Sequence, residues 1–162
     1  MCKITYYKYF MIYNAKMKNA LLIIDMQYDL CNGGPMAFEN SLNIIPIINR
    51  LRDNYDNVIF VRKWYPENHS SFKQFGGKYP KHCVQDTSGA NIHNDIISKK
   101  DDCIISRGSL QKYDSNSAFC DAEPISKQTR LKQVLKAYDI QKLYFLDLKF
   151  SAFNIKNMVS IF

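Results

Sequence analysis

A continuous run of aliphatic residues, 20–24, constrains the fold more than any other feature of the chain. It is too short for a typical helix and apolar on both faces, which predicts a central strand of a parallel sheet. Further predicted strands and helices alternate along the chain, the strands at 58–61, 103–105 and 143–146 and the helices at 44–51 and 131–138. Such alternation predicts a three-layer α/β sandwich around a central, mostly parallel sheet with right-handed crossovers.

Composition and length point to one soluble domain. The chain has 162 residues, of which 46% are hydrophobic and 14% aromatic, enough to bury a core. No apolar run approaches the ~20 residues that span a bilayer, and residues 1–16 are too interrupted by polar side chains for a signal peptide. We therefore expect a cytoplasmic protein with no membrane partner. Because Met17 leads directly into the first apolar run, we interpret 1–16 as a disordered leader or a mis-called start, and 17–162 as the domain.

The positive charge of the chain does not indicate a nucleic-acid partner. The formal net charge is +7, but beyond residue 16 the basic residues are mixed with Asp and Glu. No aromatic stacking platform or nucleic-acid motif accompanies them, so we predict no binding to nucleic acid. The five cysteines form no CxxC pair, and their odd number argues against a disulfide framework. We expect reduced thiols.

Three charged side chains follow predicted strands at the edge where parallel sheets bind ligands. They are Asp25, Lys63 and Arg107. The stretch from 64 to 100 has little periodicity, and a loop of that length in a compact domain is usually functional. Asp25, partly desolvated at the end of a buried strand, could act as a general base; alternatively it caps the strand and bonds loop amides.

The segment 20–34 resembles the first strand and loop of the nicotinamidase group of isochorismatase-like hydrolases. The resemblance lies in the pattern Asp25-x-Gln27-x-Asp29, followed by Cys31 and two glycines. In that family the aspartate serves a cysteine nucleophile, and the reaction converts nicotinamide and water to nicotinate and ammonia. The resemblance favours a catalytic role for Asp25 over strand capping.

Two further segments resemble the family's metal-binding blocks, and they match only in part. Residues 63–72 are similar to Asp-Trp-His-Pro-x-Asn-His-x-Ser-Phe, in which the aspartate and the histidines ligate a divalent metal such as zinc. Here Lys63 replaces the aspartate, Tyr65 replaces the first histidine, and only His69 matches. The block at 79–90 supplies one more matching ligand, His82.

These replacements remove the charge and the donors that a dication needs. An ammonium brings positive charge, and a phenol is a poor ligand at neutral pH. We therefore expect no metal cofactor in this copy. Lys63 could occupy part of the vacated space and bond His69 or His82; alternatively, both are ordinary surface histidines.

The catalytic lysine and the aromatic pocket of the family are also altered. Residues 104–109 and 114–119 resemble the family's Lys-Gly turn and its Asp-Ser-Tyr-Ser-Ala-Phe segment, with Arg107 at the lysine. Guanidinium keeps the charge but not the geometry of an ammonium. Leu30 and Tyr79 stand where the family tends to have Phe and Trp, so the substrate-binding contacts with a pyridine ring are changed.

No thiol stands at the family's nucleophile position. Alignment from the preceding strand places Phe153 there, and alignment from the following residues places Asn154 there. Neither side chain can form the thioester intermediate. The resemblance also stops short of the family's late strands. We expect those strands to be missing, which would leave a sheet edge for a homo-oligomer or another partner to cover.

The sequence therefore predicts a nicotinamidase-like protein with little or no amidase activity. Two alternatives remain at this point. One is a cysteine-independent isochorismatase-type hydrolase that uses Asp25 and Arg107 for proton transfer. The other is a noncatalytic interaction protein that joins a partner through the exposed sheet edge.

Overall fold

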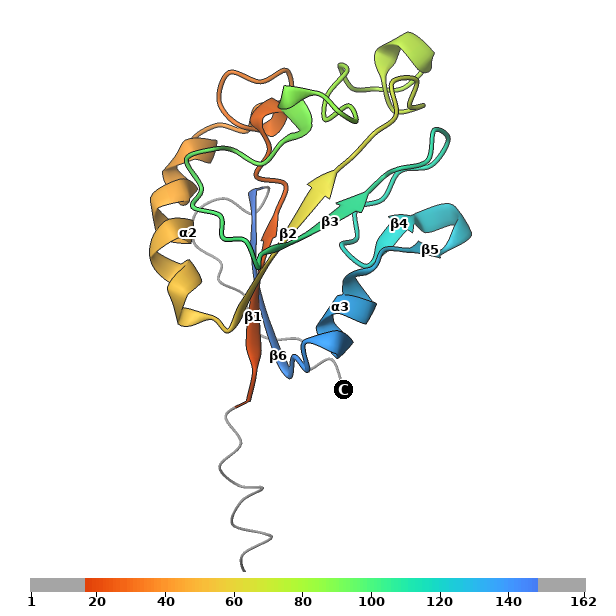
Figure 1. Ribbon diagram of the computed structural model, residues 1–162. Helices are drawn as coiled ribbons and strands as arrows, with labels where there is room; N and C mark the ends of the chain where they lie inside the picture. The colour runs from red at the N-terminus through yellow and green to blue at the C-terminus, as the bar shows by residue number, and fades with distance from the viewer. Residues whose placement is uncertain (1–16, 149–162) are drawn as a thin grey trace, which may run out of the picture.

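A four-stranded parallel sheet forms the centre of the protein (Figure 1). The computed structural model describes residues 17–148. The strands lie in the order β3-β2-β1-β6, and every neighbouring pair is parallel. Their bounds are β1 Asn19–Ile24, β2 Asn57–Lys63, β3 Cys103–Arg107 and β6 Lys142–Asp147. The predicted central strand and the parallel sheet are confirmed.

Helices cover the two faces of this sheet, as the sequence predicts. Helix α2 (Ile45–Leu51) lies on one side and α3 (Leu131–Ala137) on the other (Figure 1). Pro46 lies in the first turn of α2, where its missing N–H costs no hydrogen bond. The fold is therefore the expected three-layer α/β arrangement.

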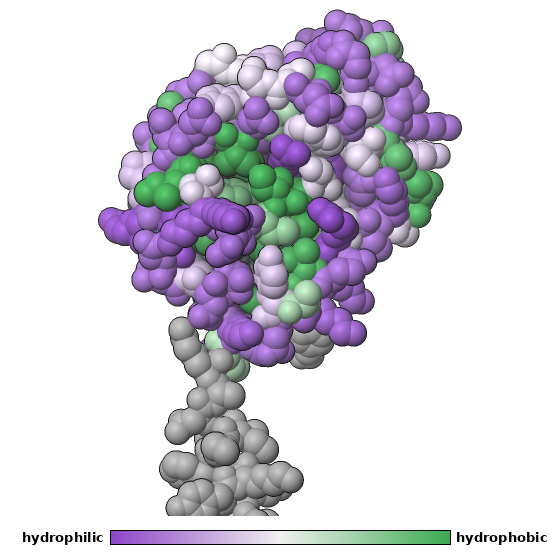
Figure 2. All heavy atoms as spheres, viewed as in Figure 1, coloured by the Kyte–Doolittle hydropathy of each residue, from purple (hydrophilic) through white to green (hydrophobic). Residues whose placement is uncertain are grey.

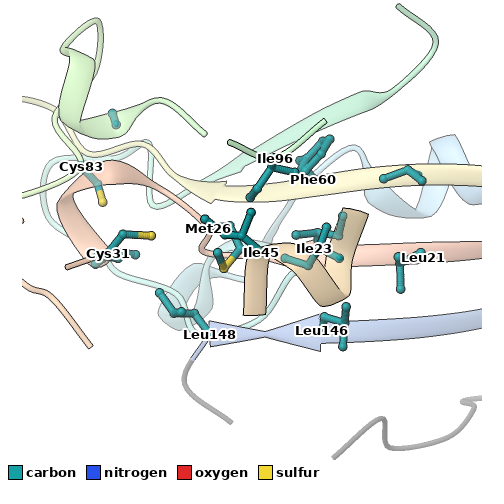
Figure 3. Close-up of a cluster of buried hydrophobic side chains, with 14 of the residues drawn as sticks. Leu21, Ile23, Met26, Cys31, Ile45, Phe60, Cys83, Ile96, Leu146 and Leu148 are labelled. Atoms are coloured by element: carbon teal, nitrogen blue, oxygen red, sulfur yellow. The ribbon is translucent and has the colours of Figure 1, made fainter. Parts of the chain in front are cut away.

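Alternation along β1 divides the core into two clusters. Leu21 and Ile23 point to the α2 side and form a first core cluster with Ile48 and Phe60. Part of this cluster is drawn in Figure 3, where Ile23 and Ile45 lie close together near Phe60 and Leu21 lies farther along the sheet. The second core cluster lies on the α3 side, and its members include Ala20, Leu22, Ile59, Leu131 and Leu135. Both faces of β1 are thus buried, which agrees with the uniformly apolar run at 20–24.

Short elements that the sequence did not predict complete the fold. Strands β4 (Cys120–Ala122) and β5 (Lys127–Gln128) pair antiparallel in a separate small sheet. Single turns of 3-10 helix punctuate the loops, namely η1 Tyr28–Leu30, η2 Ser41–Ile44, η3 Arg52–Asn54, η4 Lys73–Phe75, η5 Ser88–Ala90 and η6 Glu123–Ile125. Between residues 17 and 148, no helix has both the length and the apolar character to cross a membrane.

The surface is mostly hydrophilic, with one apolar hollow near the centre of the face seen in Figure 2. Beside edge strand β3, a pocket of about 230 Å³ is lined partly by Phe60, Ile92, Ile96 and Ile104. The side chain of Ile104 is 43% exposed.

Candidate active site

The structure brings Asp25, Lys63 and Arg107 to one edge of the sheet. Asp25 follows β1, and Lys63 and Arg107 are the last residues of β2 and β3 and are register partners. The backbone N–H of Asp25 donates to the Val61 carbonyl at 2.9 Å, and the residue takes a left-handed φ of 63° that turns the chain out of the strand. All three side chains are buried. Their placement at the carboxyl ends of parallel strands is the one the sequence predicts.

Asp25 and Arg107 form a buried ion pair. Nη2 of Arg107 donates to both carboxylate oxygens of Asp25, at 2.8 and 2.7 Å, and Nη1 donates to the Ser115 carbonyl. Burial alone would lower the pKa of Arg107, but the adjoining Asp25 carboxylate raises it above the ordinary value. Arg107 therefore stays charged, in line with the expectation that it keeps the electrostatics of the family's lysine.

The side chain of Lys63 bonds within its own segment. Its Nζ donates to Tyr65 Oη at 2.7 Å, and Tyr65 Oη donates to Asp114 Oδ1 at 2.7 Å. We call these three side chains the Lys63 relay. The backbone of Lys63 is held separately by the side-chain amide of Gln27. This amide accepts a hydrogen bond from the Lys63 N–H at 2.7 Å and donates one to the Lys63 carbonyl at 2.8 Å. The same amide nitrogen donates to the Ala90 carbonyl, which joins the ends of β1 and β2 to η5.

His69 is buried and both of its ring nitrogens are engaged. Nε2 faces the Tyr113 carbonyl at 3.2 Å, an acceptor only, so this nitrogen carries the proton. Nδ1 then accepts from Ser71, whose hydroxyl lies at 2.7 Å and whose N–H lies at 3.2 Å. Burial first, and the charge of Lys63 in addition, lower the pKa of His69, so the ring is neutral at neutral pH. In this arrangement the lone pair of the ring, on Nδ1, is engaged by Ser71.

His82 has the hydrogen bond that usually orients a metal-ligating histidine. Its Nδ1 lies 2.7 Å from the Pro80 carbonyl and must donate to it, which places the lone pair on Nε2. Burial lowers the pKa of His82, and the nearby charge of Lys63 lowers it further. His69 and His82 are 0% and 2% exposed, so the interpretation of them as ordinary surface histidines is wrong.

The residues at the family's ligand positions do not fit a zinc ion. Zinc needs three or four thiolate, imidazole or carboxylate donors around one point. Lys63 offers an ammonium, and burial raises the pKa of the Tyr65 hydroxyl far above its usual range. Within residues 17–148, no group of three His, Cys, Asp or Glu side chains is arranged to hold a metal. That this copy takes no metal remains a prediction that binding measurements must test.

Cys83 lies close enough to Asp25, Lys63 and Arg107 for their charges to affect its pKa, and it is held as a thiol. Cys83 is buried, adopts a left-handed φ of 49°, and donates its backbone N–H to Asp29 Oδ2 at 2.6 Å. Figure 3 places it with Cys31 at one end of the first core cluster. Burial raises the pKa of Cys83 strongly, and the carboxylates of Asp29 and Asp25 raise it further. It is poorly suited to replace the missing nucleophile.

The two predicted substrate contacts lie in different environments. Leu30, in η1, is 2% exposed and belongs to the first core cluster, so its side chain packs inside the domain. Tyr79 is 44% exposed, and its ring centre lies 6.1 Å from that of His82. The two positions predicted to replace the nucleophile, Phe153 and Asn154, lie outside the described residues.

Sequence reasoning missed two residues that shape the site. Asp114 lies within the segment that resembles the family, but its contact with Tyr65 depends on how the loop before β4 folds back. Gly108 adopts a φ of 72°, and a Cβ there would lie 2.5 Å from Tyr65 Cε1. A glycine directly after a strand-end arginine was the only available signal for this close approach.

Comparisons with known proteins agree with this architecture. Residues 19–146 match the isochorismatase domain family. In an alignment of 141 residues, the chain is 33% identical to the nicotinamidase of Acinetobacter baylyi, and the match covers 77% of this chain and 65% of that protein. It is 31% identical to the nicotinamidase of Escherichia coli, where the match covers 80% of this chain and 69% of that protein. Coverage of the Acinetobacter protein is thus slightly below two thirds.

Solved structures show the same likeness. The nicotinamidase/pyrazinamidase of Acinetobacter baumanii superimposes with a TM-score of 0.74 at 32% identity, covering 82% of this chain and 72% of that one. The Pyrococcus horikoshii pyrazinamidase, solved in complex with zinc, superimposes with a TM-score of 0.70 at 30% identity, covering 80% of this chain and 70% of that one. The family match and these relatives agree with a parallel sheet that carries Asp25 at its carboxyl edge. The chain therefore belongs to the isochorismatase family.

Proposed function

We propose that this chain is a nicotinamidase-like protein in which the hydrolysis of nicotinamide is lost or strongly impaired. The observation that carries the proposal is that no thiol within residues 17–148 is suited to activation by Asp25. The sequence from 121 to 162 contains no cysteine. Among the cysteines of residues 17–148, Cys83 is the one whose pKa responds to Asp25, and it is buried and held protonated. A thioester route needs a thiolate.

We propose in addition that this copy works without a metal cofactor. Lys63 and Tyr65 bond each other at the positions where the resemblance places an aspartate and a histidine, and both ring nitrogens of His69 are engaged by protein groups. His82 alone keeps a ligand geometry, and one imidazole is a weak site for a dication.

The alternative acid-catalysed route receives no support from the ion pair. A cysteine-independent hydrolase would need a side chain that gives a proton to its substrate. The Asp25 carboxylate raises the pKa of Arg107, so the guanidinium keeps its protons. Both oxygens of Asp25 accept hydrogen bonds from that cation.

Release of ammonia from nicotinamide by the full purified chain tests the proposal, with Escherichia coli nicotinamidase as the positive control. We expect kcat/KM to be at least roughly 10⁴-fold below the control, because removing a catalytic nucleophile costs this much or more. A rate within 100-fold of the control would overturn the proposal, and its loss in Cys83→Ala but not in Cys103→Ala would identify Cys83 as the nucleophile.

A further inference from the structure

A chain of hydrogen-bonded polar side chains connects β2 to the loop before β4. In the Lys63 relay, the Lys63 ammonium donates to the Tyr65 hydroxyl, which donates to Asp114. The same carboxylate oxygen, Oδ1, also accepts the Ser115 N–H at 2.7 Å. Lys63 is 6% exposed and Tyr65 is 1% exposed, so these two members of the relay are shielded from water, and Asp114 is half-buried.

The two ends of the relay carry opposite charges. Burial would raise the pKa of Asp114, but the charge of Lys63 and the hydrogen bonds from Tyr65 and Ser115 lower it below its ordinary value. Asp114 is therefore a carboxylate at neutral pH. An ammonium and a carboxylate joined through one hydroxyl form a neutral unit that needs no further ion.

The Tyr65 ring fills the space between the two histidines. Its centre lies 4.2 Å from that of His69, 5.3 Å from that of His82 and 5.8 Å from that of Phe72. On another side, the ring lies close to the backbone at Gly108, where the absence of a Cβ leaves room for it. Aromatic side chains thus pack where the resemblance places a metal and its ligands.

We propose that the Lys63 relay is an internal replacement for the metal centre, in which the ammonium supplies the positive charge and Tyr65 fills the volume. This inference rests on the metal-free part of the proposed function, and it goes further by naming what took the place of the ion. Two side chains, at 63 and 65, would then separate this centre from a zinc site. The backbone at 63 is already held by Gln27, whatever side chain it carries.

The unaltered chain provides the first test. The full purified protein, treated with EDTA and dialysed, is titrated with zinc chloride by calorimetry, and its melting temperature is recorded with and without zinc. We expect no stoichiometric binding at micromolar zinc and a change in melting temperature of less than about 1 °C, because only a ligand of the native state raises the melting temperature. Tight one-to-one binding, or a melting temperature that rises with zinc concentration, would overturn the inference.

Restoring the family's residues provides the second test. The variant Lys63→Asp/Tyr65→His should bind one zinc ion and melt at a temperature that rises with zinc, whereas adding His82→Ala should abolish both effects. If the double variant is unfolded without zinc, circular dichroism upon zinc addition gives the answer, because metal binding then drives folding. A variant that neither binds zinc nor folds with it contradicts the idea that two side chains separate the centres.

The charge within the relay is tested by a third set of variants. Lys63→Met should lower the melting temperature by at least about 4 °C, and adding Asp114→Asn should return part of that loss. Strictly additive effects would show that the relay is not an ion pair. None of these measurements involves nicotinamide. Amidase activity in the purified chain would therefore refute the proposed loss of activity, and the variant series would still test the relay separately.

Discussion

The close approach of Gly108 to Tyr65 predicts a large and specific cost for one added methyl group. In Gly108→Ala the new Cβ would lie 2.5 Å from Cε1 and 3.0 Å from Cδ1 of the tyrosine ring. The ring has little room to move, because it is 1% exposed and packs against His69, Phe72 and His82. Either the ring or the turn after β3 must shift.

The magnitude has two parts. Placing alanine at a φ of 72° costs about 1–2 kcal/mol, because the left-handed region favours glycine. Overpacking against a buried ring adds about 1–3 kcal/mol. Gly76 has a similar φ of 86°, and nothing lies within 4 Å of a Cβ built there, so Gly76→Ala should carry only the first part.

Urea unfolding at 25 °C, followed by circular dichroism, measures both variants. We expect Gly108→Ala to lose about 2–5 kcal/mol of the free energy of unfolding and Gly76→Ala about 1–2 kcal/mol. In a Tyr65→Leu background, the excess cost at Gly108 should shrink, since the clashing ring atoms are gone. Equal losses in the two glycine variants would refute the packing of Tyr65 against this turn.

Two further predictions concern the buried charges. Arg107→Met leaves the Asp25 carboxylate buried without its cation and should lower the free energy of unfolding by about 3–5 kcal/mol. The double variant Arg107→Met/Asp25→Asn should recover part of that loss. Urea titrations that show no recovery would contradict the ion pair. Burial lowers the pKa of His69 and of His82 in the folded state, so the unfolded chain binds protons first as the pH falls. The free energy of unfolding should therefore decrease as the pH drops below about 6.5, and His82→Asn should flatten this slope; an unchanged slope would count against the lowered pKa.

The sheet could be predicted because its signals are local. The run 20–24 is apolar on both faces, and the structure buries both faces of β1. The shared location of Asp25, Lys63 and Arg107 followed from parallel topology alone. Strands β4 and β5 could not be predicted, because segments of three and two residues are too short to show a period.

The contacts inside the site were harder to predict because they join distant segments. The sequence suggested a histidine as the partner of Lys63, whereas the structure gives it the Tyr65 hydroxyl and places its charge near both imidazoles. Tyr65 lies two residues on, and side chains two apart in an extended chain share a face, so this partner was within reach of sequence reasoning. The hydrogen bond of His69 to the Tyr113 carbonyl spans 44 residues and had no local signal.

The Gln27 amide explains how such a site can change its chemistry and keep its shape. It forms hydrogen bonds with the backbone N–H and carbonyl of residue 63, and every residue except proline has both groups. The side chain at 63 is therefore chemically independent of the bonds that position it. A carboxylate can be exchanged there for an ammonium, reversing the sign of the local charge, while the strand end stays where the amide holds it. Gln27 thus fixes the backbone of position 63 through bonds that do not depend on the side chain that this residue carries.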